Sequence, residues 1–183
     1  MNHAAILLMS CIALAACNRE PQVEAKNASV EEVAKKVADA RASDTFVRPG
    51  KWQSRVQIEE FNLPGVPKET ATAMRGMHDQ TKVYESCLTP EEAKRPKAGF
   101  FAGKDKSCRY DHFTMGNGKI DAVMNCTTAG MDQTMEMAGT YGPDNYQMHM
   151  SMKTNGGPAP AAGMTMKMRI DAKRIGECDR TTA

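Results

Sequence analysis

Leucine is scarce in this chain of 183 residues. It occurs five times, and only Leu63 and Leu88 lie beyond residue 17. The length is enough for one domain with a real core plus a short appendage. Methionine, with 15 residues, is abundant instead. We therefore expect methionine to supply much of the core, because its unbranched and polarizable side chain fills irregular gaps.

The sequence also has no block of charge of one sign. Its 24 Lys and Arg residues nearly balance 22 Asp and Glu residues, and the surplus is spread along the chain. Nucleic-acid-binding proteins concentrate basic residues in patches that neutralise phosphates. The composition therefore argues against a nucleic-acid partner.

Recognisable catalytic motifs are missing as well. There is no G-x-S-x-G, no H-E-x-x-H and no glycine-rich phosphate loop. The nearest acid-base pairs are His78-Asp79 and Asp111-His112, but neighbours in a strand face opposite ways, so Asp111 cannot orient His112. A three-residue turn after the strand of His112 would place that histidine opposite Ala122, on an inner face. We predict a protein that is not an enzyme and needs no cofactor.

The N-terminus predicts export and a lipid anchor. From Ala4 to Ala16 the residues are apolar or small, which suits a signal-peptide core and is too short to span a bilayer. Leu14-Ala15-Ala16-Cys17 resembles the bacterial lipobox, which implies a signal peptide over residues 1–16 and an acylated Cys17 held in a membrane. Asn18 then favours the outer membrane, facing the periplasm. The alternative is an ordinary cleaved signal with Cys17 incidental.

Residues 17–48 are predicted to form a lipidated tether with one helix. The segment up to Asn27 is polar and without periodicity. Ser29 and Glu32 then match a capping box, and small apolar residues recur at helical spacing, so we expect a helix over residues 29–42. A β domain over residues 49–178 and a tail over 179–183 complete the chain.

From residue 49 the apolar residues recur with period two. Trp52, Val56 and Ile58 alternate with polar residues, which is typical of a half-buried antiparallel strand. Later strands flank turn sequences such as Gly116-Asn117-Gly118, and one short helix starts at Pro90. The predicted fold is mostly β: an antiparallel meander of six or seven strands, forming a curved open sheet or a partly closed barrel.

No pair of cysteines has C-x-x-C spacing, which argues against a zinc site and a redox dithiol. With Cys11 and Cys17 set aside, Cys87, Cys108, Cys126 and Cys178 remain, and an oxidising compartment implies two disulfides. A three-residue turn centred on Asn117 places Cys108 opposite Cys126, which leaves Cys87 for Cys178. A two-residue turn would misalign the first pair.

The most unusual feature is methionine at every second position in the later strands. One hairpin register pairs Met152 with Met164, Met150 with Met166 and Met148 with Met168, on a single face. Met135 and Met137 continue the pattern one strand earlier, and His149 points to the other face. This apolar face comprises Met135, Met137, Met148, Met150, Met152, Met164, Met166 and Met168.

Four interpretations of these methionines remain open. They form the core, or they bind an apolar ligand or an envelope protein on an incompletely covered surface. Alternatively their soft thioethers bind Cu(I) or Ag(I), with Met150 and Met166 as the first ligands to consider. A regular ladder spreads its sulfur atoms along a line, whereas a metal site needs donors that converge on a point, and this weighs against the metal site. A further interpretation is that exposed methionines protect the protein by being oxidised themselves.

Several motifs together resemble a family of small proteobacterial envelope proteins known as a domain of unknown function. They are Pro49-Gly50-Lys51-Trp52, the Cys87 to Ala93 segment CLTPEEA, the later Cys108 and Cys126, the Met-x-Met strands and Gly176-Glu177-Cys178. The resemblance covers about residues 49–178. It implies an exported, disulfide-bearing periplasmic domain, and no catalytic residue can be transferred from it to this sequence.

Overall fold

The structure is a computed structural model that describes residues 23–41, 47–67, 69–70, 72–73, 81–94, 107–128, 130–157 and 162–178. The predicted signal peptide (1–16), Cys17 and the tail (179–183) lie outside the described residues, so those predictions stay untested by the fold.

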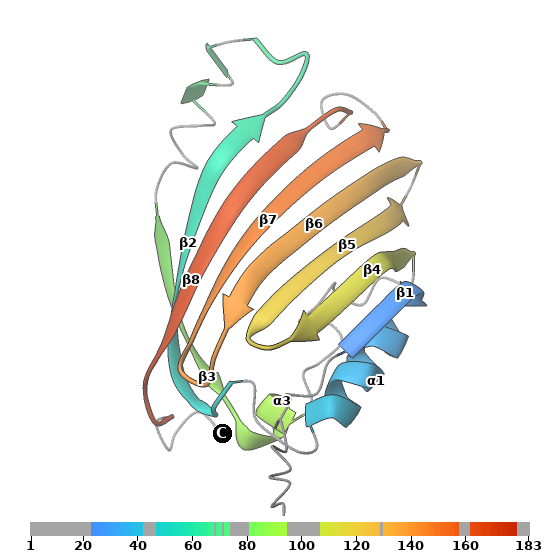
Figure 1. Ribbon diagram of the computed structural model, residues 1–183. Coiled ribbons are helices and arrows are strands. Elements are labelled where there is room, and N and C mark those ends of the chain that lie inside the picture. Colours follow the sequence, from blue (N-terminus) through green and yellow to red (C-terminus); the bar gives the residue numbers. More distant parts are fainter. Residues whose placement is uncertain are drawn as a thin grey trace, which may run out of the picture.

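The described chain forms one open, strongly curved antiparallel sheet (Figure 1). Its spatial order is β1-β4-β5-β6-β7-β8-β2-β3. The strands are β1 (Val23–Ser29), β2 (Gly50–Asn62), β3 (Lys82–Leu88), β4 (Cys108–Gly116), β5 (Lys119–Thr128), β6 (Met131–Tyr141), β7 (Asn145–Gly156) and β8 (Thr165–Gly176). The mostly-β prediction is confirmed, with the open sheet rather than the barrel and with one strand more than expected.

The additional strand is β1, at one edge of the sheet. It pairs with β4 from Val23↔Met115 to Ser29↔Arg109, and Val23, Ala25 and Ala28 are buried. The interpretation of this segment as polar tether is therefore wrong from Val23 onward. Asn27, at φ 47°, interrupts the alternation, which hides the strand from a period-two pattern.

Helix α1 (Val30–Arg41) follows β1 directly and confirms the predicted helix. The Ser29 hydroxyl accepts a hydrogen bond from the Glu32 amide at 3.1 Å, so the cap is formed as expected. Val33 and Val37, fully buried, pack in the same cluster as Tyr110 and Phe113. The small apolar stripe therefore covers one end of the sheet.

The short helix α3 (Pro90–Lys94) also has its predicted cap. The Glu92 amide donates to Thr89 Oγ1 at 3.2 Å, and the Thr89 amide donates to Glu92 Oε2 at 3.3 Å. Ala93 is buried.

The β4–β5 hairpin turns in two residues, not three. Gly116 pairs with Lys119, and Asn117 and Gly118 both have positive φ. This turn alone would misalign the cysteines, but an irregularity at Asp111 adds one residue and restores the register, so that Cys108 opposes and bonds Cys126. The disulfide prediction is confirmed, whereas the turn from which it was derived is wrong.

The two faces of the sheet differ in character. We call the face that carries Tyr110, Phe113 and Met124 the inner face, because α1 packs in one cluster with these residues. The opposite, outer face is polar and carries His149 and most of the charged side chains, as the alternation of exposed residues along each strand shows.

Candidate functional site: the methionine face

Seven of the eight predicted methionines lie on strands, with their side chains on the inner face. Met135 and Met137 lie on β6, Met148, Met150 and Met152 on β7, and Met166 and Met168 on β8, while Met164 precedes β8. Met137 is buried and the other seven are partly buried. We call this set the methionine face.

The predicted β7–β8 register is wrong by two residues. Met150 pairs with Met168, Met152 with Met166, and Met148 with Ile170. A shift of two keeps every side chain on its face, so the composition of the face survives. Met164 has no ladder partner, and its carbonyl accepts a hydrogen bond from the Thr154 amide at 2.9 Å.

The ladders align the methionines in rows that cross the sheet. One row contains Tyr110, Met124, Met135, Met152, Met166 and Phe61, and the next contains Phe113, Ala122, Met137, Met150, Met168 and Ile58. Neighbouring strands lie about 4.8 Å apart, so side chains of one row touch along its length. These two rows thus form a continuous apolar band across the inner face.

Helix α1 packs over one part of this band and leaves the other part partly exposed, so the band has two halves. The covered half, on β1, β4 and β5, packs against α1, and its Tyr110, Phe113 and Met124 are at most 1% exposed. The open half comprises Met148, Met150, Met152, Met166 and Met168 with Val56, Ile58, Phe61 and Ile170, all partly buried. Among the described elements, the main contacts of α1 are with β1 and β4, and no helix has comparable contact with β7, β8 or β2.

Sequence analysis missed Met124 as a member of the band. Met124 opposes Met135 and is 1% exposed. A signal was present, because Met124 stands two residues before Cys126 and must share its face. Tyr146 was also missed; its ring packs against that of Trp52, with 5.7 Å between the ring centroids, at the far end of the same face.

The outer face has its own hollow, of about 310 Å³. His112, Asp121, Glu136, His149 and Lys167 are among its lining residues, and His112 Nε2 lies 2.6 Å from Asp121 Oδ1. The prediction of an interior His112 opposite Ala122 is wrong, because His112 opposes Val123. Within the described residues, no group of three or more His, Cys, Asp or Glu could hold a metal ion.

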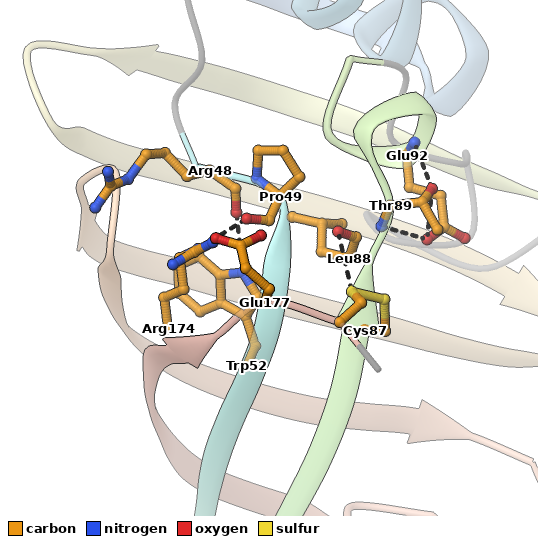
Figure 2. Close-up of a disulfide and its surroundings, with 10 residues drawn as sticks. Arg48, Pro49, Trp52, Cys87, Leu88, Thr89, Glu92, Arg174 and Glu177 are labelled. Atoms are coloured by element: carbon orange, nitrogen blue, oxygen red, sulfur yellow. Dashed lines mark hydrogen bonds and ion pairs between the residues drawn. A yellow bond between two sulfur atoms is a disulfide. The ribbon is translucent and has the colours of Figure 1, made fainter. Parts of the chain in front are cut away.

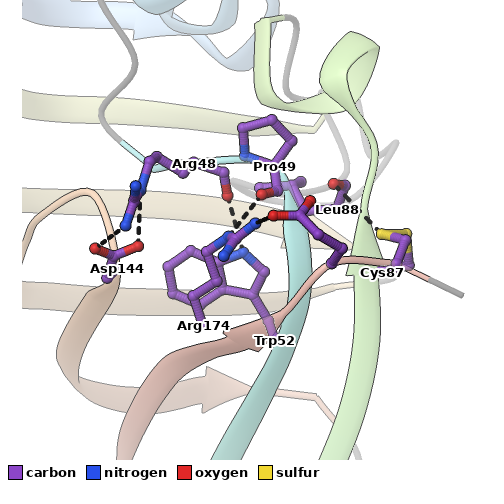
Figure 3. A network of polar contacts seen from close by, with 9 residues as sticks. Arg48, Pro49, Trp52, Cys87, Leu88, Asp144 and Arg174 are labelled. Atoms are coloured by element: carbon purple, nitrogen blue, oxygen red, sulfur yellow. Dashed lines mark hydrogen bonds and ion pairs between the residues drawn. A yellow bond between two sulfur atoms is a disulfide. The ribbon is translucent and has the colours of Figure 1, made fainter.

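A polar clamp joins the ends of β2, β7 and β8 (Figure 3). Arg48 Nε donates to Asp144 Oδ1 at 2.8 Å, and Arg174 Nε donates to the Pro49 carbonyl at 2.7 Å. Trp52 Nε1 donates to the Arg48 carbonyl at 3.0 Å. Gly50, at φ 140°, lies so close to Arg174 that a Cβ would be 2.5 Å from its Nε. These contacts explain the Pro-Gly-Lys-Trp motif structurally.

The Cys87–Cys178 disulfide, with a Cα–Cα distance of 5.5 Å, lies next to the clamp (Figure 2). It joins β3 to the segment after β8, and Glu177 forms an ion pair with Arg174. Thr89 and Glu92 cap α3 close by (Figure 2). Three of the motifs that suggested a family, Pro49–Trp52, Cys87–Ala93 and Gly176–Cys178, thus meet at one end of the sheet, where their contacts join β2, β3 and β8.

Electrostatics separate the two faces. Burial raises the pKa of Tyr110 on the inner face to about 12, so this hydroxyl stays neutral. On the outer face, hydrogen bonds from Arg169 and Gln147 lower the pKa of Asp171.

In the part of the chain that the structure describes, no helix has the length and apolarity to cross a membrane.

Taken together, the fold and its faces define a class: a disulfide-stapled antiparallel β domain with one apolar face, partly covered by a helix. The family model described as "Protein of unknown function (DUF3617)" matches residues 47–178. The chain belongs to this family. No curated protein and no solved structure matched the chain. The match begins after β1 and α1, so these two elements lie outside the matched residues.

Proposed function

We propose that this protein is a non-enzymatic lipoprotein of the cell envelope that binds an apolar ligand on the open half of the methionine face. The observation that carries the proposal is the open half itself, which is apolar across β7, β8 and β2 and is left partly exposed by the described elements. Pliable methionine surfaces accommodate apolar partners of varied shape.

The localisation in this proposal is supported by the sequence of the N-terminus. An acylated Cys17 would anchor the domain in the outer membrane, facing the periplasm, with few residues between the anchor and β1 at Val23. The two disulfides suit such an oxidising compartment. An envelope protein is the competing occupant of the open half, and the Cu(I) or Ag(I) site at Met150 and Met166 remains a prediction that no contact favours.

The test is binding of a neutral fluorescent probe, 1-N-phenylnaphthylamine, to the full chain carrying Cys17→Ser, so that no covalent acyl group competes. Met150→Gln combined with Met168→Gln makes an opposing pair polar in the middle of the open half. We expect the double variant to weaken binding by about tenfold, since 1.4 kcal/mol of lost apolar contact corresponds to that factor.

The matched control is Lys153→Gln, an exposed change on the outer face of the same strand, which should leave the probe affinity unchanged. Far-ultraviolet circular dichroism checks that each variant is folded. Failure of the unsubstituted face to bind the probe would contradict the proposal, as would equal affinities of the double variant and the control.

A further inference from the structure

We propose, resting on the function proposed above, that the ligand of the open half is a long-chain carboxylate, and that Lys82 binds its anionic head. The acyl chain would lie along the rows of the open half, and the carboxylate would meet the Lys82 ammonium at the β3 edge of the sheet.

The position of Lys82 follows from the ladder register. Lys82 opposes Val56 on β2, Val56 opposes Ile170 on β8, and Ile170 opposes Met148 on β7. Residues that are directly opposed across antiparallel strands share a face. Lys82 therefore projects from the inner face in line with one row of the open half, and it is exposed.

The charge on the two faces favours an anion at this position. Every acidic strand residue that has a ladder partner lies on the outer face, as its partner does: Glu24, Glu60, Glu85, Asp121, Asp132, Glu136 and Asp171. The inner-facing positions of the described strands thus include no acidic ladder residue, so no carboxylate on them opposes an anionic ligand.

Lys82 is also better placed than the second inner-facing cation. Arg174 opposes Trp52, but its guanidinium already donates to the Pro49 carbonyl and forms an ion pair with Glu177. Only 17% of the Arg174 side chain is exposed, whereas Lys82 is an exposed residue. Among the inner-facing ladder residues that the structure describes, Lys82 is thus the cation left available, and its single charge matches a ligand with a single negative charge.

The width of the open half and the residue beside Lys82 at its edge both suit an acyl chain with a charged head group. From β3 to β7 there are three strand spacings, about 14 Å, which a long acyl chain can span. Tyr84, two residues from Lys82 and 53% exposed, faces the same side. A tyrosine with an apolar ring and a polar tip suits the boundary between an apolar surface and a solvated head group.

The experiment compares an anionic probe, cis-parinarate, with the neutral 1-N-phenylnaphthylamine on the full chain carrying Cys17→Ser. We expect Lys82→Gln to weaken parinarate binding by about threefold and Lys82→Glu by about tenfold, as exposed ion pairs contribute modestly. Neither variant should change the affinity for the neutral probe. Lys173→Glu, an exposed substitution on the outer face, is the charge-matched control and should change neither affinity.

The outcomes separate this inference from the function on which it rests. Binding of neither probe defeats the proposed function itself. Binding of both, with parinarate affinity unchanged by Lys82→Glu or reduced equally by Lys173→Glu, defeats the carboxylate proposal alone. Lys82-dependent sedimentation with phosphatidylglycerol vesicles, without an effect on parinarate, would replace the free carboxylate by a membrane surface.

Discussion

The covered half and the open half of the inner face both contain methionine, but they differ in how deeply the methionine side chains are buried. Met115 and Met124 in the covered half are 5% and 1% exposed, beside Val33 and Val37 of α1. Met150 and Met168, two and three strands from Met124 along the same band, keep part of their surface exposed. The methionines of the covered half are therefore buried more deeply than those of the open half.

Each half also has its own disulfide. Cys108–Cys126 joins two neighbouring strands of the covered half, and Cys87–Cys178 joins β3 to the end of β8 beside the open half. The sequence separations are 18 and 91 residues. Since α1 is absent from the open side, we infer that the second disulfide and the polar clamp hold that side in place.

The largest expected effect is the loss of the Cys87–Cys178 disulfide. In the chain-entropy model a cross-link over the longer loop stabilises more, about 4.6 kcal/mol against about 3.2 kcal/mol for Cys108–Cys126. Paired Cys→Ala substitutions should lower the free energy of unfolding in that order, as measured by urea denaturation. A larger loss from the Cys108 and Cys126 pair would show that the covered half depends more on its cross-link.

An intermediate effect is expected from truncating methionines in the two halves. Met124→Ala should lower the free energy of unfolding by about 3 kcal/mol, because it leaves a cavity in the buried cluster to which α1 contributes Val33 and Val37. Met168→Ala should cost about 1 kcal/mol, because the site is partly open to solvent and little apolar transfer is lost. Denaturant unfolding measures both.

The control for this pair is Met124→Leu, which preserves most of the volume and should cost less than about 1.5 kcal/mol. If Met168→Ala destabilises as much as Met124→Ala, the open half is covered in solution by another segment or molecule, and the division into two halves is wrong.

These halves were only partly predictable from sequence. Period-two methionines identify the apolar face, because parity alone decides which face a side chain occupies, and a register error of two residues at Met150 and Met166 leaves it unchanged. The Cys108–Cys126 pair was predicted from a wrong turn, which the irregularity at Asp111 compensates. Such a bulge depends on tertiary packing, so the local sequence does not reveal it.

The position of α1 on the sheet was harder to predict than the composition of the methionine face. The capping box at Ser29 predicts where α1 begins, but β1 is short and interrupted at Asn27, so nothing local shows that the helix returns to the sheet. Lys82 was likewise overlooked, because its value as a cation depends on which face of β3 it occupies. The pairing register of the strands shows which face Lys82 occupies, whereas the amino-acid composition does not.

The smallest expected effect concerns the cover itself. Ser29 ends β1 and caps α1, with its Oγ accepting from the Glu32 amide at 3.1 Å. Ser29→Ala removes this acceptor and should lower the free energy of unfolding by about 1 kcal/mol. Because α1 covers Tyr110 and Met124, fraying of its first turn should also raise 1-N-phenylnaphthylamine fluorescence above that of the unsubstituted protein. Ser29→Asp, which keeps a capping oxygen, should restore both values. An Ala variant with normal stability and unchanged fluorescence would mean that packing of Val33 and Val37 holds α1 without its cap.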